Sequence, residues 1–551
     1  MKKLLLLCVA LAVAVTNAQA QQKTVWQISI TADTMPNAQR KVMAHMQMDG
    51  YDGTIGIKLR GNSSLSFNQK KYTIELRDNQ GHEVESPLLG MPAHSDWVLL
   101  APYSDVSAIR DPLAFQLWRD MGHWGPRTQM VELTLNGDYR GIYILSEAIK
   151  RGEQRVNVSK LKKTDIEGRE LTGGYILRID TYDQDDATFI SKVPGIGEGN
   201  MSSQIIWSCI YPKKKKLKQE QFDYIHNYVD TMEQVIQSDY FADPERGYAQ
   251  YIDVPSFVDY FIHTELSLNA DGYKRSAYFY KEKMNADGTG GKLVAGPVWD
   301  YNLAYGNANF ANANNIEAWC FEGASNNPTP ALWQRLLQDP AFRKAVKVRY
   351  KALRKGILSN KAINGCIDRH ARLLAPCIAR HFEKYPELLV SEEEKKNMPK
   401  TQPFGMFPPM GMFPPMGGVF PPMGGFQMPD SIPQFPGGFP PMGDFQMPDS
   451  IPQFPGGFPP MGDFQGFGGG FNAIAMFMAY RVSSYDEEIT ILKQWFADRL
   501  DFLDRNIERF DKDWEPRIQE PKEIKMPQFI GFPFGHLDIP ASLYPAAHHR
   551  P

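Results

Sequence analysis

Short runs of alternating or mostly apolar residues dominate the first third of the chain and predict β-strands. Residues 71–76 show the pattern most clearly, because apolar and polar side chains alternate as in a strand with one buried face. Residues 130–135 and 139–145 flank Asn136-Gly137, a dipeptide typical of the tight turn in a β-hairpin. Similar strand patterns lie at residues 55–59, 97–101 and 174–180.

In the middle of the chain the apolar spacing changes to the period of an amphipathic helix. One stripe runs from Phe222 to Ile236, and Asp253 before Pro255 is typical of the start of a further helix, which we expect to reach residue 268. The patterns therefore predict an α+β protein with a β-rich N-terminal part and a helical C-terminal part. The other predicted helices cover residues 107–121, 330–356, 361–385 and about 484–510, and short strands are expected at 277–281 and 292–298.

Residues 403–470 differ in kind, because Gly, Pro, Phe and Met dominate them and residues 426–444 recur unchanged as 445–463. Such a composition does not favour a packed core and predicts a disordered or extended insertion. Its Phe and Met side chains are candidates for protein contacts, and a functionally silent, expanded repeat is an equal alternative. The apolar face of the helix after it needs a partner, so we expect the insertion to interrupt one domain. The expected organisation is a signal peptide at 1–20, a domain at 21–402, the insertion at 403–470, the C-terminal helical part of the same domain at 471–514, and a tail at 515–551.

The first twenty residues have the pattern of a secretory signal. A basic start, Met1-Lys2-Lys3, precedes an apolar stretch at residues 4–15 and the small-residue cleavage pattern Ala18-Gln19-Ala20. That stretch is too short to span a bilayer comfortably, and no later stretch is long and apolar enough. We therefore expect a secreted, periplasmic or cell-surface protein without an integral membrane segment.

Charge and cysteine content exclude several other classes of protein. The 551 residues carry a formal net charge of -3, so nothing points to nucleic acid, and the basic run at 213–216 is interpreted as a solvated helix start. A zinc hydrolase would show histidine ligands at recognisable spacing, and the closest pair is His548-His549 near the end of the chain. One or two disulfides remain open, but no zinc-type spacing occurs among the four cysteines after the signal, Cys209, Cys320, Cys366 and Cys377.

Candidate chemistry lies where two predicted strands begin or end. Asp300 and Asn302 follow the apolar run at 292–298, and Asp271 precedes the strand at 277–281. Carboxylate and carboxamide oxygens suit a hard divalent cation. The alternative is that these residues cap turns and bind the backbone, as Asp and Asn commonly do.

Six motifs along the chain occur in a recognisable order. They are Arg60-Gly61-Asn62-Ser63-Ser64; Lys70-Lys71-Tyr72-Thr73-Ile74; Trp97-Val98-Leu99-Leu100 with Asp105 and Arg110; Leu135-Asn136-Gly137-Asp138-Tyr139-Arg140-Gly141-Ile142-Tyr143 running into Glu147; Asn269-Ala270-Asp271; and Trp299-Asp300-Tyr301-Asn302. This order resembles the CotH family, the spore-coat-protein-H-like atypical protein kinases. The resemblance covers about residues 58–306, and the helix near 489–507 looks like the C-terminal end of that family.

The resemblance implies a divergent protein-kinase-like fold that transfers the γ-phosphoryl group of ATP to a Ser or Thr hydroxyl with Mg²⁺ or Mn²⁺. Phosphoryl transfer depends mostly on positioning and charge neutralisation, so few groups are needed. Lys71, or Lys70, would reach the α- and β-phosphates, with Glu147 as its ion-pair partner. Asp271 would accept the proton of the hydroxyl group on a protein substrate. By the same resemblance, Arg60, Asn62, Ser63 and Ser64 would bind the nucleotide, and Asp300 with Asn302 would bind the metal.

Two positions depart from the family pattern. Many members carry an asparagine five residues after the aspartate that corresponds to Asp271, and this chain has Ser276 there. Asn302 replaces the second acidic residue of the family's Trp-Asp-x-Asp motif. Both changes reduce the oxygen or charge available to a cation. The alternative hypothesis is therefore a catalytically inactive pseudokinase that acts as a secreted protein- or surface-binding module.

Overall fold

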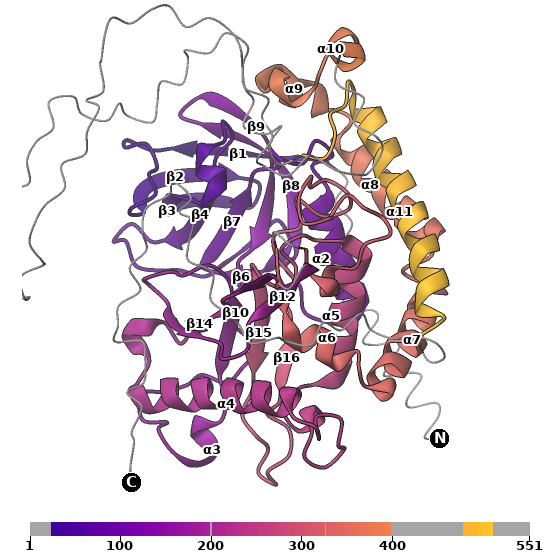
Figure 1. The fold of residues 1–551 in the computed structure, drawn as a ribbon. Helices are drawn as coiled ribbons and strands as arrows, with labels where there is room; N and C mark the ends of the chain where they lie inside the picture. Colours follow the sequence, from indigo (N-terminus) through magenta and orange to yellow (C-terminus); the bar gives the residue numbers. More distant parts are fainter. Residues whose placement is uncertain (1–23, 199–200, 325–326, 398–477, 511–551) are drawn as a thin grey trace, which may run out of the picture. The chain divides into compact units, whose positions relative to one another are not determined.

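The computed structural model describes residues 24–198, 201–324, 327–397 and 478–510, which all belong to one compact unit (Figure 1). The predicted signal peptide, insertion and tail lie outside the described residues.

The β-rich N-terminal part forms a closed barrel in the strand order β1-β2-β3-β4-β7-β9-β8. Neighbouring strands are antiparallel, except that β1 and β8 are parallel. Apolar side chains such as Ile57, Ile74 and Leu133 fill its interior and are fully buried. The seven strands are β1 (Trp26–Thr31), β2 (Val42–Met48), β3 (Tyr51–Arg60), β4 (Lys71–Arg77), β7 (Asp96–Leu100), β8 (Thr128–Leu135) and β9 (Asp138–Glu147).

A second sheet has the antiparallel strand order β11-β14-β10-β15-β16 and packs in one large core with most of the helices. Its strands are β10 (Tyr175–Ile179), β11 (Ala187–Ile190), β14 (Ile206–Tyr211), β15 (Ala277–Lys281) and β16 (Leu293–Ala295). The smaller strands are β5 (Ser86–Leu88), β6 (Met91–His94), β12 (Gly195–Gly197), β13 (Met201–Ser203) and β17 (Thr329–Pro330). The helices are α2 (Arg110–Asp120), α3 (Gly168–Leu171), α4 (Gln219–Gln237), α5 (Val254–Ser267), α6 (Ala331–Leu336), α7 (Pro340–Arg354), α8 (Asn360–Leu374), α9 (Ile378–Lys384), α10 (Glu392–Asn397) and α11 (Tyr485–Ile507).

The predicted division into a β-rich N-terminal part and a helical C-terminal part is confirmed. The hairpin at Asn136-Gly137 is confirmed too, since both residues have the positive φ (51° and 77°) that a type I′ turn requires. Asp253 caps α5 as predicted, because its Oδ2 accepts the Ser256 N–H at 3.0 Å. The strand expected at 292–298 is shorter and ends at Ala295, where Gly296 takes a φ of +103° and Pro297 has no N–H to donate.

Two predicted helices are each split by a proline. The helix expected at 330–356 is α6 followed by α7, because Asp339 accepts the Ala341 N–H and Pro340 occupies the first turn of a new helix. The helix expected at 361–385 breaks into α8 and α9 around Pro376, which cannot donate the hydrogen bond that would continue it. Strands β11 to β14 were not predicted at all.

Helix α11, drawn in yellow in Figure 1, lies along α8 and contacts α5 and α7. Its side chains Leu492, Phe496 and Leu503 belong to the same core as α2 and α5. Ser484 caps it by accepting the Glu487 N–H at 3.2 Å. Met478 is the first described residue after 397, and it forms an isolated β-bridge with Ala308. The described chain therefore resumes beside the loop that follows Asp300.

A fully buried arginine, Arg110, links this C-terminal segment to the rest of the core. Its guanidinium donates to Asp105 Oδ1 at 2.5 Å, Glu488 Oε1 at 2.6 Å and the Tyr480 hydroxyl at 2.7 Å. Its Nε donates to the carbonyl of Ala304 at 3.1 Å. Arg110, Asp105 and Glu488 expose 1% or less of their side chains, so their charges are compensated within the protein.

The four cysteines within the described segments are free thiols, and burial is the main cause that raises the pKa of each. Among the described helices, none combines the length and apolar character needed to cross a bilayer.

We predict that Arg110→Met destabilises the protein strongly, because it leaves two buried carboxylates without their cation. The free energy of unfolding, measured by urea denaturation, should fall by about 3–5 kcal/mol. The control is Arg505→Met in α11, whose partner Asp501 is as exposed as Arg505 itself. That change should cost less than about 1 kcal/mol. Equal losses in both variants would contradict the role given to the buried network.

Candidate active site

The β3–β4 hairpin places Arg60 and Lys71 opposite each other, since the two residues are register partners at the ends of their strands. Between them, residues 61–70 form a loop with a short 3₁₀ turn at Ser63–Ser66. Gly61 has a φ of +120°, and a Cβ there would lie 2.0 Å from the Ser64 hydroxyl oxygen, so the turn depends on glycine. The predicted nucleotide-binding residues Asn62 and Ser63 are exposed at its tip.

The two adjacent lysines have different surroundings. Lys70 donates from Nζ to the carbonyl of Leu65 at 2.7 Å and so closes its own loop. Lys71 Nζ lies 3.5 Å from Asp300 Oδ1, and only 11% of its side chain is exposed. The structure therefore points to Lys71 as the site lysine among the two alternatives.

Asp300 lies in the loop after β16 and has a left-handed backbone conformation, with a φ of 64°. Such a conformation is uncommon outside glycine and has to be held by its surroundings. The next residue supplies one constraint, because the Tyr301 N–H donates to Asp111 Oδ1 at 2.6 Å. The Asp300 carboxylate remains 45% exposed beside Lys71 and is accessible to a ligand.

Asp271 lies in the loop between α5 and β15. Its Oδ1 is buried and accepts no hydrogen bond from the described residues, and the nearest cation is Arg275, whose Nε is 3.8 Å away. Burial raises the pKa of Asp271 to about 6, and the negative charges of Asp300 and Asp180 act in the same direction. Asn269 links the two loops, because its Oδ1 accepts the Asp271 N–H at 3.2 Å and its Nδ2 donates to the Asp300 carbonyl at 3.4 Å.

The residues at the two departures from the family pattern have protein partners. Asn302 donates from Nδ2 to the Ser104 hydroxyl at 2.7 Å. Ser276 has a left-handed φ of 50°, and its hydroxyl lies 3.5 Å from Asp180 Oδ2. Neither side chain is paired with Asp300 or Asp271.

The predicted ion pair between Lys71 and Glu147 is wrong. Glu147 accepts hydrogen bonds from Arg127 and Arg155 and is fully buried. It pairs across strands with Trp97, a residue of the barrel interior, whereas Lys71 lies on the opposite face of the barrel wall. Because strand side chains alternate between faces, the two residues cannot meet.

Sequence reasoning missed one buried acid of this site, Asp111. It is 4% exposed, and burial together with the charge of Asp300 raises its pKa to about 7, against the opposing effect of Lys71. Asp111 follows Arg110 of the third motif, but an acidic residue in the first turn of a helix is usually interpreted as stabilising the helix N-terminus. Its tertiary contact with Tyr301 gives no signal in the sequence.

Within the described residues, no three His, Cys, Asp or Glu side chains group as a self-sufficient metal cage. A Mg²⁺ site of the nucleotide-dependent kind takes one or two carboxylates from the protein and the remaining ligands from phosphates and water. The partly exposed carboxylate of Asp300 fits the oxygen donors that such a cation prefers.

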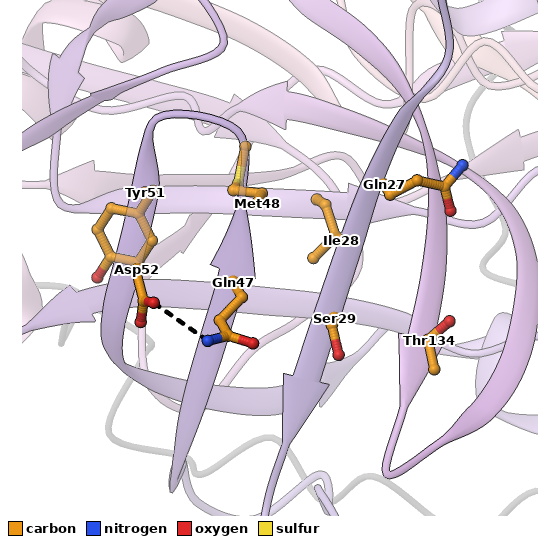
Figure 2. A pocket seen from close by; sticks show the side chains of 8 residues that line it. All are labelled: Gln27, Ile28, Ser29, Gln47, Met48, Tyr51, Asp52 and Thr134. Atoms are coloured by element: carbon orange, nitrogen blue, oxygen red, sulfur yellow. Dashed lines mark hydrogen bonds between the residues drawn. The ribbon is translucent and has the colours of Figure 1, made fainter.

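A depression of about 430 Å³ lies elsewhere, on the outer face of the barrel (Figure 2). Residues of β1, β2, β3 and β8 line it, and Gln47 there donates to Asp52 at 3.1 Å. It includes none of the predicted site residues and lies at the end of β3 opposite to Arg60.

The candidate site therefore consists of Lys71 paired with Asp300, together with the aspartates Asp271 and Asp111. The family model described as CotH kinase protein matches residues 57–405, which is more than half of the chain. The protein therefore belongs to the CotH family, as the motif order predicted. A comparison with curated proteins finds no match.

We predict that Glu147→Gln affects stability and not the site. The change leaves Arg127 and buried Arg155 without their carboxylate, and unfolding free energy should fall by about 3 kcal/mol. Nucleotide affinity, measured by calorimetry below the unfolding temperature, should change less than twofold. A large loss of affinity without a loss of stability would restore the Lys71–Glu147 interpretation.

Proposed function

We propose that this CotH-family protein is an exported atypical protein kinase. It transfers the γ-phosphoryl group of ATP to Ser or Thr hydroxyls of exported proteins, with Mg²⁺ or Mn²⁺ as the cation. The observation that carries the proposal is the 3.5 Å contact between Lys71 of the barrel and Asp300 of the loop after β16. Family membership supports the proposed reaction class, and this contact supports the proposed location of the site.

In this proposal the positive groups of the β3–β4 hairpin bind the phosphates. Lys71 neutralises the α- and β-phosphates, and the exposed turn at Asn62, Ser63 and Ser64 offers N–H groups and hydroxyls to the others. Arg60 is held over the ring of Trp299, 5.3 Å from its centroid, and so stays beside Asp300. When Asp300 binds a cation, the phosphates replace it as the negatively charged partner of Lys71.

Asp271 is the proposed proton acceptor. The substrate hydroxyl oxygen attacks the γ-phosphorus while its proton passes to Asp271, and ADP leaves with the electrons of the broken P–O bond. A carboxylate whose pKa is raised to about 6 is ionised at neutral pH yet is a better base than an ordinary aspartate. A bound divalent cation would neutralise phosphate charge, and Asp300 would hold it.

Export is proposed from the signal pattern in residues 1–20, which lie outside the described residues. The substrate is accordingly a protein met outside the cytoplasm, and the Phe- and Met-rich insertion at 403–470 is a candidate for protein contacts. Both statements come from the amino-acid sequence.

The direct test is incubation of the mature protein with radiolabelled ATP and Mg²⁺ or Mn²⁺, with or without an added acceptor protein. We expect label on protein that falls at least a hundredfold in Asp271→Asn and in Asp300→Ala, because one removes the base and the other the cation ligand. Asp287→Asn, in an exposed turn after β15, is the matched control and should label normally.

No label and no nucleotide-induced thermal shift would overturn the kinase proposal. The alternative would then stand, a pseudokinase that binds proteins, and the partners formed by Ser276 and Asn302 would be its structural basis.

The pH dependence should report Asp271. Because the base must be ionised, kcat/KM should rise about tenfold per pH unit below pH 6 and level off above it. Arg275 lowers the pKa of Asp271, so Arg275→Leu should move this rise to higher pH. Arg246→Leu, on an exposed turn, should leave the profile unchanged. An identical profile in all three proteins would exclude Asp271 as the titrating base.

A further inference from the structure

Asn302, at the second position of the family's Trp-Asp-x-Asp motif, is held in place by contacts with other residues of the protein. Asn302 donates to the Ser104 hydroxyl, and its backbone carbonyl accepts from Asn307 Nδ2 at 2.7 Å. Asn307 is fully buried and also donates to the carbonyl of Ser104 at 2.6 Å. It therefore links the backbones of Ser104 and Asn302. Asn302 is also a neutral amide and brings no negative charge to the cation, so Asp300 is the one carboxylate of this motif.

Asp111 is a buried carboxylate with too few partners. It is 4% exposed, and its one recorded hydrogen bond within the described residues comes from the Tyr301 N–H to Oδ1. No Lys, Arg or His of the described chain lies within 4.0 Å of it, in contrast to Asp105, the neighbouring buried aspartate that is paired with Arg110. A buried carboxylate is unfavourable in its charged form unless it has a cationic partner, so a bound cation would stabilise the charged form of Asp111.

The hydrogen bond from the Tyr301 N–H indicates where a cation bound to Asp111 would lie. Tyr301 directly follows Asp300, so the Asp111 carboxylate lies against the backbone of the metal-ligand candidate. Lys71 and Arg60 lie beside Asp300, with Lys71 Nζ 3.5 Å from Asp300 Oδ1. Asp111 has no ion-pair partner among the described residues, and a divalent cation bound by both carboxylates would supply one.

We propose that Asp111 is the second carboxylate that binds the divalent cation with Asp300, in place of the acid that Asn302 lacks. This inference rests on the proposed function, since the remaining ligands are the phosphate oxygens of a bound nucleotide. It assigns to α2 a direct part in the site. It also gives a partner to a buried carboxyl group whose one recorded hydrogen bond within the described residues comes from the Tyr301 N–H.

The test is Mn²⁺ binding to the full mature chain in the presence of ADP, followed by the electron paramagnetic resonance signal of free Mn²⁺. Asp111→Asn keeps an acceptor for the Tyr301 N–H but removes the charge. We expect it to weaken Mn²⁺ binding by about tenfold or more, as Asp300→Asn should. Asp120→Asn, at the exposed end of the same helix, should stay within twofold.

A second measurement separates this role from a structural one. Without metal, Asp111→Asn should unfold at the same temperature as the wild type or higher, while the stabilisation by Mn²⁺ and ADP should be lost. Wild-type Mn²⁺ affinity in Asp111→Asn, with Asp300→Asn defective, would overturn the inference and leave the proposed function intact. Absence of Mn²⁺ uptake by the wild type, even with ADP, would overturn both.

Discussion

The compensation of one buried positive charge, that of Arg110, organises the centre of this protein. Its guanidinium reaches Asp105 before α2, Glu488 in α11 and the carbonyl of Ala304 in the loop after Asp300. A buried arginine is tolerated only when such partners surround it, so these segments are fixed relative to each other. Asp111 follows Arg110 directly, and Ala304 is four residues from Asp300. The same network that satisfies the arginine thus holds both acids of the proposed cation site close to each other.

The alternation of side chains along the barrel strands decides which residues face the site. Lys71 and Thr73 lie on the outer face of β4, where Val98, the partner of Thr73, belongs to the same core as α2. Tyr72 and Ile74 fill the barrel interior. The alternation, and therefore the strand, could be predicted from residues 71–76 alone. The pairing of Lys71 could not, because it depends on which loop the outer face meets, and that loop lies more than two hundred residues later in the chain.

Where the sequence was interpreted wrongly, a local signal was outweighed or absent. Asp339-Pro340 is a strong helix start, but the apolar period on both sides favoured one long helix. Strands β11 to β14 are only three to six residues long, too short for a period to emerge. Asp111 has the position of a helix-start acid, and its hydrogen bond joins residues 190 positions apart. By contrast, the short-range features, the Asn136-Gly137 turn and the caps at Asp253 and Ser484, were predictable because their partners lie within a few residues.

The contact between Arg110 and Glu488 spans 378 positions of the sequence. During synthesis, the amino-terminal barrel and α2 are complete long before α11 exists, so Arg110 has no Glu488 or Tyr480 to neutralise it. Contacts of such long range form late, since the intervening chain must first be closed into a loop. The core of this protein therefore cannot reach its final state until α11 has been added.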